Sequence, residues 1–436
     1  MRFIHTADWH LGNQMHDIDR HTEAQTFFRW LKEQIIEKQA DTLIVAGDVF
    51  DTANPSVEAR RLYYTFLASL VDSCCKNVII VGGNHDSAIM LDSAKELLEV
   101  LNIRVVGSIN NLAPEDMCFE LRGADDTING ICMAVPFMRE VELRNVLSSR
   151  SSDTDCTLNE VKTTDGDLYS LAYKKVYTDI FSAAKRLRSK RNIPIIATGH
   201  LYAAELEGRL NGVASNVKTD DGVKVLDVLG TLGNVPPAVF PPADYVALGH
   251  IHYTTMVAKN PAVRYSGSPF VMGFDEAALA HYVLCVDITE SGGTVLVEKL
   301  ETPQPFVYRR LSGTLAEIKA ELQRLLVLGG AVKPIYLELC YQREFGVNAQ
   351  DFLDDTIRAL PEHITVVSWK ITEQEKVFSA ANGFEQFEAA EIKNLDDKEI
   401  FTQLILTKSG LDGASEEGKR AVGTFLPLLM QIAGEV

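Results

Sequence analysis

Short runs made up mainly of apolar residues, many of them β-branched, recur through the first two thirds of the chain. They lie at residues 42–46, 78–81, 193–198 and 244–248, and another run spans 103–106. Such runs predict buried strands, because a strand covered on both faces has no polar side. Amphipathic stretches at 22–39, 56–71 and 87–101 predict helices. Strands that alternate with helices in this way indicate the α/β class.

The pattern changes after residue 301. Pro303 and Pro305 indicate a linker. Beyond it, predicted strands at 306–311, 332–341 and 364–371 alternate with predicted helices at 314–328 and 348–360. This alternation indicates a small α+β domain. Two further apolar-periodic stretches, 384–406 and 415–432, predict a C-terminal pair of helices that needs a partner to bury its apolar faces. We therefore expect domains at 1–300, 306–375 and 384–436.

Two stretches lack such periodicity. Residues 148–170 are rich in Ser, Thr and Asp, and residues 211–233 carry repeated Gly and Asp. Both are predicted to be surface loops. Loops of this length are often functional or disordered, and the sequence leaves their role open.

Metal-ligating residue types occur in five places, which are Asp8/His10, Gly47/Asp48, Gly83 to Asp86, Gly199/His200 and Gly249 to His252. The last four follow predicted strands, and the first comes shortly after a first strand pattern around Ile4. Each alone has an ordinary explanation as a turn or a partly buried histidine. Together they indicate a site, because functional groups of open α/β sheets lie beyond the carboxyl ends of strands. His5 is different, since it lies within the first strand pattern, and we interpret it as structural.

Carboxylate, carboxamide and imidazole groups in one cluster favour a site for two divalent ions. Two such ions neutralise a phosphoester and lower the pKa of a bound water. A mixed oxygen and nitrogen set suits Mn²⁺, Fe or Zn²⁺, whereas an all-oxygen set would favour Mg²⁺. Asp48 is the natural candidate for the carboxylate that bridges both ions. The motifs therefore predict a two-metal phosphoesterase.

Length and composition agree with a multidomain globular protein. A chain of 436 residues with 46% hydrophobic content suggests two or three domains. No apolar run of eighteen residues occurs, so we expect no membrane span. We expect no signal peptide either, because the polar Asp8-Trp9-His10 comes too early. Seven cysteines without metal-type spacing indicate reduced thiols of a cytoplasmic protein.

The order and context of these motifs resemble those of the calcineurin-like metallophosphoesterases and, within them, the SbcD family of bacterial nuclease subunits. The resemblance covers residues 1–280 closely. It is carried by residues 1–12, 46–52, 83–87, 197–201, 240–245, 265–269 and 274–276. It implies a metallophosphoesterase β-sandwich flanked by helices, with the small α+β domain capping the cleft.

The resemblance also implies roles for individual residues. One ion would be held by Asp8, His10, Asp48 and His252, and the other by Asp48, Asn84, His200 and His250. His85 would contact the scissile phosphate and help to protonate the leaving oxygen. Asp86 would orient His85 by fixing its tautomer and ring direction. Asp51 stands where some relatives outside bacteria carry a histidine, so its role stays open.

The function implied by the resemblance is that of a Mn²⁺-dependent DNA nuclease. It would act as an exonuclease on duplex DNA and as an endonuclease on single strands and hairpins, in DNA repair, replication and recombination. The expected partners are DNA, an SbcC-like ATPase subunit and a second copy of the chain. The homodimer would form through helices 56–71 and 87–101, and residues 384–436 would dock on the ATPase.

Two alternatives differ in class from this interpretation. One is a calcineurin-like phosphatase or phosphodiesterase that acts on an ester other than nucleic acid, which would not need the C-terminal architecture. The other is a non-catalytic DNA-end clamp with structural metals. The complete ligand set argues against the clamp.

A net charge of −18 is unusual for a DNA-binding protein, because phosphate contacts need Lys and Arg. Bound metals would bring positive charge into the cleft. One basic cluster stands out, and it comprises Lys174, Lys175, Lys185, Arg186, Arg188, Lys190 and Arg191. It fits a solvated helix face as well as a DNA contact. We therefore expect a partner to supply much of the affinity for DNA.

Overall fold

The computed structural model of the chain describes most of the region that carries the motifs. The described residues are 1–16, 18–148, 165–203, 217–218, 224–225, 235–327, 333–342, 357–358, 360–372, 402 and 415–433. The chain divides into two compact units, Met1–Glu373 and Gln374–Val436.

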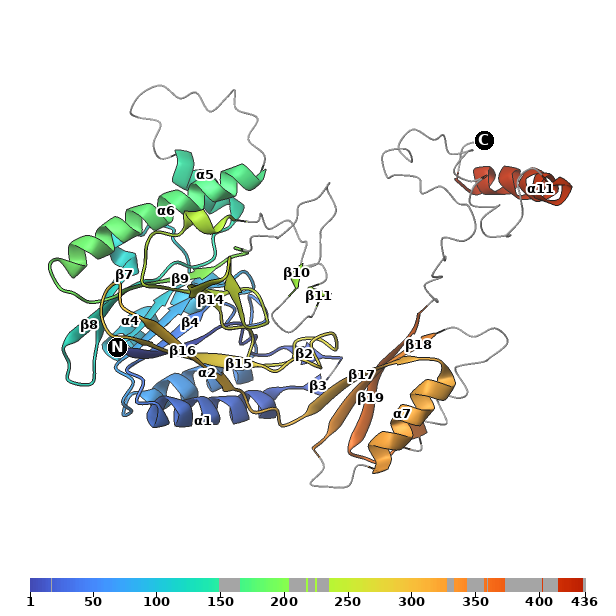
Figure 1. The fold of residues 1–436 in the computed structure, drawn as a ribbon, viewed down its shortest axis with the longest axis horizontal. Coiled ribbons are helices and arrows are strands. Elements are labelled where there is room, and N and C mark those ends of the chain that lie inside the picture. The colour runs from blue at the N-terminus through green and yellow to red at the C-terminus, as the bar shows by residue number, and fades with distance from the viewer. Residues whose placement is uncertain are drawn as a thin grey trace. The chain divides into compact units, whose positions relative to one another are not determined.

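A six-stranded sheet carries the first three motifs (Figure 1). Its parallel strands are β1 (Arg2–Thr6), β4 (Thr42–Ala46), β5 (Asn77–Val81) and β6 (Ile103–Val106). On the other side of β1, β15 (Tyr282–Ile288) and β16 (Val295–Glu301) continue the sheet in antiparallel order. One face packs against α1 (His21–Glu37), α2 (Val57–Leu70), α3 (Ala88–Asp92) and α4 (Lys95–Val100).

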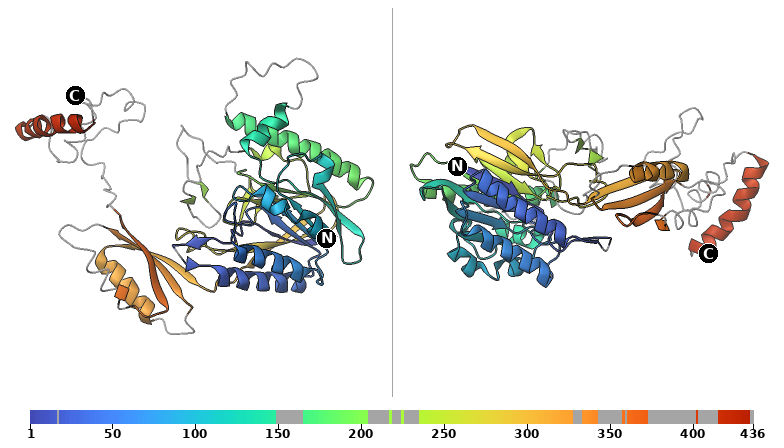
Figure 2. Two further views of the ribbon diagram at one scale, coloured as in Figure 1. Left: turned by 180° about the vertical axis from the view of Figure 1, so that it is seen from behind. Right: turned by 90° about the horizontal axis from the view of Figure 1, so that it is seen from below.

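A second six-stranded sheet carries the last two motifs. Its order is β13 (Thr255–Val257), β14 (Asn260–Tyr265), β12 (Tyr245–Gly249), β9 (Ile195–His200), β8 (Ile128–Met133) and β7 (Cys118–Arg122). Strands β8, β9, β12 and β14 run parallel. Helix α6 (Asp165–Arg188) packs against this sheet and against α5 (Glu140–Ser148). Figure 2 shows α6 on the side of the sandwich opposite α1 and α2.

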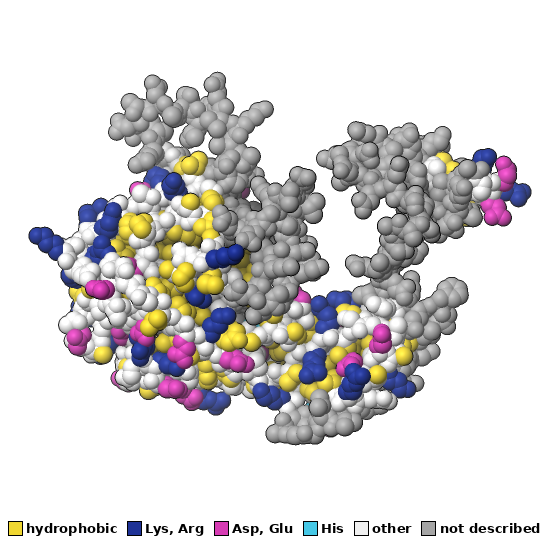
Figure 3. Space-filling view, in the orientation of Figure 1, with side chains coloured by type: hydrophobic (Ala, Val, Ile, Leu, Met, Phe, Trp, Pro, Cys, Tyr) yellow, Lys and Arg dark blue, Asp and Glu magenta, His cyan; other side chains and the backbone are white. Residues whose placement is uncertain are grey.

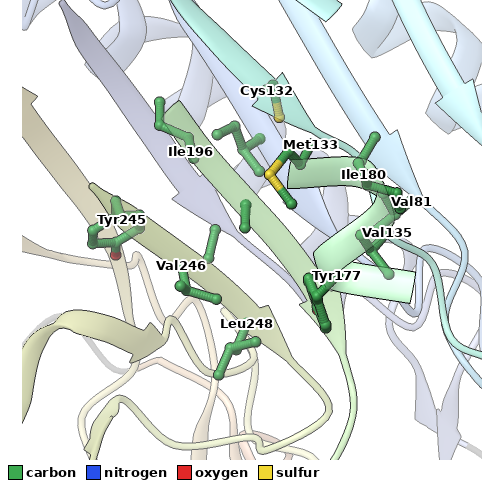
Figure 4. Close-up of a cluster of buried hydrophobic side chains, with 14 of the residues drawn as sticks. Val81, Cys132, Met133, Val135, Tyr177, Ile180, Ile196, Tyr245, Val246 and Leu248 are labelled. Atoms are coloured by element: carbon green, nitrogen blue, oxygen red, sulfur yellow. The ribbon is translucent and has the colours of Figure 1, made fainter. Parts of the chain in front are cut away.

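The two sheets share one apolar core. Buried side chains from the first sheet, such as Ile44 and Val81, belong to the same cluster as Met133 and Val246 from the second. Tyr177 of α6 closes the cluster from outside the second sheet (Figure 4). Each fully buried side chain of this size contributes about 1.5–3 kcal/mol. The resulting sandwich flanked by helices confirms the predicted fold class.

Most predicted elements lie within a few residues of those observed, with two exceptions. The helix predicted at 87–101 is interrupted, because Ala94 has φ −118° and ψ 17°, outside the helical region, and so separates α3 from α4. The loops predicted at 148–170 and 211–233 also contain regular structure. Helix α6 begins at Asp165, and the second loop holds an antiparallel pair, β10 (Val217–Lys218) and β11 (Lys224–Val225).

A separate three-stranded sheet follows the sandwich. Strands β17 (Val307–Gly313), β18 (Ile335–Gln342) and β19 (Ile364–Thr372) are parallel, and α7 (Leu315–Val327) packs on them. The predicted helix at 348–360 falls almost entirely outside the described residues. Tyr308 of β17 shares a small apolar cluster with Met15, Val271 and Phe274 of the preceding region. The division at residues 300 to 306 stays a prediction.

In the second unit, the structure describes α11 (Glu416–Ala433), close to the predicted helix at 415–432. The predicted helix at 384–406 lies outside the described residues, apart from residue 402. No helix in the described part of the chain is long and apolar enough to cross a membrane. The remaining short elements are β2 (Gln14–Met15), β3 (Ile18–Asp19) and the single 3-10 turns Pro114–Met117 and Pro237–Val239.

Candidate metal centre

All seven predicted ligands lie at or just beyond the carboxyl ends of strands. Asp8 and His10 follow β1, Asp48 follows β4 and Asn84 follows β5. His200 is the last residue of β9, and His250 and His252 follow β12. The two sheets therefore bring residues separated by up to 244 positions into one cluster.

The backbone of this cluster is unusual. Asp8, His10, Asp48 and His250 all have positive φ values, at 53°, 41°, 49° and 97°. The left-handed region costs an L-residue about 1–3 kcal/mol. Hydrogen bonds between the loops offset this cost, since the N–H of Asp8 donates to the carbonyl of Gly47 and that of His10 to the carbonyl of Asp48, each at 3.0 Å. Such strain is typical of functional sites.

Two glycines allow the loops to approach this closely. A Cβ atom on Gly83 would lie 2.1 Å from Oδ1 of Asp48, and one on Gly47 would lie 2.2 Å from Nδ1 of His200. Neither position can carry a side chain without displacing a predicted ligand. The glycines of these motifs therefore serve the packing of the site itself.

Asp48 lies between the two predicted ligand sets. Its Oδ2 atom is 3.2 Å from Nε2 of His200 and 3.6 Å from Nε2 of His10. Its Oδ1 atom accepts a hydrogen bond from the N–H of His85 at 2.9 Å. One carboxylate oxygen thus faces a histidine from each set, as a bridging ligand requires.

Asn84 and Asp8 connect the remaining ligands. The Oδ1 atom of Asn84 is 3.0 Å from Nε2 of His200 and 3.0 Å from Nδ1 of His250. The carboxylate of Asp8 accepts a hydrogen bond from the N–H of His250 at 2.9 Å. Ligand atoms of Asp8, His10 and His252 all lie within 4.8 Å of one another. The structure therefore brings both predicted sets together.

The charges of the cluster fit bound cations. Burial alone would lower the pKa of a histidine, yet nearby carboxylates raise the pKa of two imidazoles of the cluster. The charge of Asp48 raises the pKa of His200 to about 9, and Glu276 and Asp8 raise that of His252 to about 9. Burial and the charge of His200 lower the pKa of His250 to about 3.

His10 provides a direct test of whether the site fits metal ions. Its side chain is 2% exposed, and within the described residues neither ring nitrogen makes a hydrogen bond of regular geometry, although carboxylate oxygens of Asp51 and Asp48 lie 3.3 and 3.6 Å away. An unsatisfied buried polar group carries a free-energy cost that a metal ligand does not. Together with the carboxylate and amide donors, this incompletely satisfied imidazole fits a divalent cation.

The predicted role of Asp86 is wrong. Its buried carboxylate accepts hydrogen bonds from the N–H groups of Val49, Phe50 and Gly83, at 2.9 to 3.1 Å, and makes none to the ring of His85. The Nδ1 atom of His85 instead lies 2.8 Å from the carbonyl oxygen of Asp51. Asp86 therefore links the loop after β4 to the loop after β5. The backbone carbonyl of Asp51 sets the orientation of the His85 ring.

Three polar side chains near the cluster were given no role by the motifs. Asp51 has a carboxylate oxygen 3.3 Å from Nδ1 of His10, and Glu276 has one 3.4 Å from Nδ1 of His252. Arg139 is exposed and donates to the carbonyl of Asp86 at 3.2 Å, beside His85. The segment 274–276 carried part of the family resemblance, and that was the available signal for Glu276.

His5 and the basic cluster both have structural explanations. His5 is buried, and its ring nitrogens lie 3.1 Å from the hydroxyl of Tyr245 and 3.2 Å from the carbonyl of Leu248. In the basic cluster on and after α6, Lys175 pairs with Asp179, Arg186 with Glu115 and Arg191 with Glu120. On the face shown in Figure 3, Lys and Arg are scattered among acidic and apolar side chains. These pairs favour the solvated-face interpretation of the basic cluster.

The fold and its ligand cluster define the class of protein as a metal-dependent phosphoesterase. The profile of the family described as calcineurin-like phosphoesterase matches residues 1–254. The chain is 31% identical over 444 residues to the D subunit of the nuclease SbcCD of Escherichia coli K12, covering 100% of this chain and 99% of the relative.

Other relatives carry the same name. The chain is 32% identical to the D subunit of the nuclease SbcCD of Rhodobacter capsulatus, covering 74% of this chain and 76% of the relative. The Bacillus subtilis protein is 28% identical, with coverage of 73% and 74%. The chain therefore belongs to the calcineurin-like phosphoesterase family and, within it, to the SbcD family.

Proposed function

We propose that the chain is a Mn²⁺-dependent DNA nuclease, the D subunit of a cytoplasmic SbcCD-like complex that processes DNA ends in repair, replication and recombination. Its activities would be exonuclease cleavage of duplex DNA and endonuclease cleavage of single strands and hairpins. The observation that carries this proposal is the convergence of all seven ligands in a chain similar over its full length to the D subunit of a nuclease SbcCD.

Each ion would have four ligands from this chain. Asp8, His10, Asp48 and His252 would hold the first, and Asp48 with Asn84, His200 and His250 the second. When bound, two such ions neutralise the charge of a phosphodiester and lower the pKa of a bound water. Mn²⁺ is favoured because the set mixes carboxylate, amide and imidazole donors, whereas Mg²⁺ prefers oxygen ligands and waters.

His85 is placed to act on the leaving group. Its side chain is exposed, so a substrate phosphate can reach it. The carbonyl of Asp51 can only accept a hydrogen bond, and Nδ1 therefore carries a proton. That contact leaves Nε2 to face substrate, and when the ring is protonated on both nitrogens Nε2 would donate its proton to the departing oxygen and leave the neutral Nδ1–H ring. The exposed Arg139, which donates to the carbonyl of Asp86, would add positive charge close to this loop.

Self-association would involve α3 and α4. Ile89, Leu97 and Val100 are 86%, 69% and 80% exposed, which is unusual for large apolar side chains so close together in sequence. Other apolar residues of the predicted interface have a different role, because Tyr63, Phe66, Leu67, Leu70, Leu91 and Leu98 are buried in the chain's own core. We therefore propose a homodimer centred on the exposed residues of α3 and α4.

The SbcC-like ATPase would bind residues 384–436. Within this segment, α11 has an amphipathic sequence, with Leu426 buried and Phe425 54% exposed. Its residues Val422, Phe425, Leu426 and Leu429 have the i, i+3, i+4, i+7 spacing of the anchors by which an amphipathic helix binds in a groove of a partner. Because the chain has a net charge of −18, the partner would also supply much of the basic surface that contacts DNA phosphates.

The proposal is tested by incubating the purified chain with end-labelled duplex, hairpin and single-stranded DNA in Mn²⁺ or Mg²⁺, with and without the ATPase. We expect Mn²⁺-dependent cleavage of single strands by the chain alone, and of duplex ends and hairpins with the ATPase and ATP. A generic phosphoester such as p-nitrophenyl phosphate serves as the comparison substrate. Hydrolysis of this ester without cleavage of any DNA would overturn the proposal in favour of a phosphatase.

A further inference from the structure

The four histidines of the metal centre differ in what lies behind their rings. His10 has Oδ1 of Asp51 at 3.3 Å from its Nδ1 atom, and His252 has Oε1 of Glu276 at 3.4 Å from its Nδ1 atom. Both histidines belong to the first proposed ligand set. Each imidazole of that set is therefore backed by a carboxylate.

The second set is built differently. The Nδ1 atom of His200 lies 2.8 Å from a neutral group, the carbonyl oxygen of Ala46. The Nδ1 atom of His250 lies 3.0 Å from the amide oxygen of Asn84, and because that oxygen is itself a proposed ligand, this nitrogen is the one directed at the metal position. Asp86 is near this set, but three backbone N–H groups engage its carboxylate. The second set thus has one carboxylate ligand, Asp48, and no carboxylate behind its imidazoles among the described residues.

Both backing carboxylates are fixed by the fold. The Oδ1 atom of Asp51 accepts a hydrogen bond from the side-chain amide of Asn13 at 3.0 Å, and its N–H donates to the carbonyl of Leu11. Glu276 accepts a hydrogen bond from the N–H of Met272 at 2.8 Å, and its side chain is 20% exposed. Neither carboxylate is a mobile surface group, because other hydrogen bonds fix the position of each.

A carboxylate behind a ligating imidazole has two effects. It fixes the ring and tautomer, and it makes the ligand more basic, so that loss of such a partner typically lowers metal affinity about 10- to 100-fold. It also adds negative charge near the cation. The first set has two carboxylate ligands and two backing carboxylates. The second has one carboxylate ligand, an amide and, among the described residues, no carboxylate behind either imidazole.

We propose that Asp51 and Glu276 are positioning residues that make the set of Asp8, His10, Asp48 and His252 the tighter of the two metal positions, so that it fills first. The second position then fills only at higher metal concentration and controls whether the centre is complete. This inference rests on the ligand assignment of the proposed function and adds to it an order of loading and the residues that cause it.

The test is equilibrium binding of Mn²⁺ to the metal-free full-length chain, followed by electron paramagnetic resonance of free Mn²⁺ and by calorimetry. We expect two classes of site. Asp51→Asn and Glu276→Gln, which keep the shape of each side chain, should each weaken the tighter class about 10- to 100-fold and leave the weaker class unchanged. Glu298→Gln, which removes one charge from the exposed partner of Lys38, is the matched control and should change neither class.

Two ligand variants assign the classes to positions. His10→Ala should abolish the tighter class, and His250→Ala the weaker one. Cleavage gives an independent readout, because a positioning defect raises the Mn²⁺ concentration needed for half-maximal rate while the rate at saturating Mn²⁺ stays within a fewfold of normal. If Asp51→Asn does not fold, as judged by circular dichroism, Glu276→Gln carries the same test alone.

The inference is overturned if the wild-type chain binds two ions with equal affinity. It is likewise overturned if Asp51→Asn and Glu276→Gln lower the affinity of the weaker class of site and leave the tighter class unchanged. It is also overturned if fewer than two ions bind, and in that case the ligand assignment of the proposed function fails with it. Two ions bound in the expected order without cleavage of any DNA would refute the proposed function alone.

Discussion

The carboxylate of Asp48 and the imidazole of His200 form a buried ion pair, with Oδ2 and Nε2 3.2 Å apart. Burial disfavours the charged imidazole, but the charge of Asp48 outweighs it and raises the pKa of His200 to about 9. Burial likewise opposes the protonation of His252, and Glu276 and Asp8 raise its pKa to about 9. In the absence of metal, two protons therefore occupy positions that cations would take.

This arrangement predicts how the metal-free protein responds to pH. A histidine whose pKa is raised in the folded state stabilises the fold fully below the unfolded value of 6.5, and that contribution is lost as the pH rises to about 9. The free energy of unfolding of the EDTA-treated chain should therefore fall between pH 6.5 and 9, measured by urea denaturation. With saturating Mn²⁺ it should rise between pH 6.5 and 8, because metal ions displace the protons. A flat profile without metal would contradict the ion pair.

His85→Ala should separate catalysis from metal binding. The variant removes a proton donor and no proposed ligand, so cleavage should fall about 10²- to 10⁴-fold. Two ions should still bind, as measured by metal analysis after dialysis. His363→Ala, in the following α+β domain, is the control and should cleave normally. Loss of both ions from His85→Ala, or a normal rate, would show that the role is misassigned.

Asp48→Ala should cost both ions, because one oxygen of this side chain faces a histidine of each set. Asn84→Ala should weaken only the second. Metal analysis of the two variants and the wild-type chain distinguishes a ligand that is shared by both ions from a ligand that holds only one. If Asp48→Ala kept one tightly bound ion, Asp48 would not bridge.

Self-association should depend on the exposed apolar residues of α3 and α4. The double variant Ile89→Glu, Leu97→Glu should be monomeric in light scattering at micromolar concentration, whereas the wild-type chain should be dimeric. Leu296→Glu, on β16, changes a side chain that is 63% exposed and should leave the dimer intact. A monomeric wild-type chain that stays monomeric in the full complex would remove the claim.

Truncation after Ala381 should separate the nuclease from its partner. The shortened chain keeps every proposed ligand, so Mn²⁺-dependent cleavage of single-stranded DNA should stay within a fewfold of normal. Co-purification with the ATPase and stimulation by ATP should both be lost. Full-stoichiometry co-purification of the truncated chain would place the docking site elsewhere.

The convergence of the seven predicted ligands could be expected from sequence because each lies at or within a few residues of the end of a recognisable strand. Apolar runs placed Asp48, Asn84 and His200 at strand ends, and parallel strands place those ends together. The partners of the cluster could not be predicted in this way. Asp51 reaches His10 across 41 positions and Glu276 reaches His252 across 24, and no local pattern encodes such contacts.

The error over Asp86 has a similar origin. Its neighbour in sequence is His85, which suggested a side-chain pair, yet adjacent residues in an irregular loop often face different ways. The carboxylate turns inward to the N–H groups of Val49 and Phe50, 37 and 36 positions away. The carboxylate of Asp86 points inward because buried backbone N–H groups need hydrogen-bond acceptors. That need can be recognised only in the three-dimensional structure. The break between α3 and α4 escaped prediction because the apolar spacing continues through it.

The distribution of the ligands along the chain has a consequence for biosynthesis. Asp8 is among the first residues made, but His250 and His252 lie 242 and 244 positions later, and β12 must pair with β9 before they reach the others. Contacts of such long range form late in folding. A chain that ends before β12 therefore carries only part of the predicted ligand set, and the proposed hydrolytic centre is complete only once both sheets have joined.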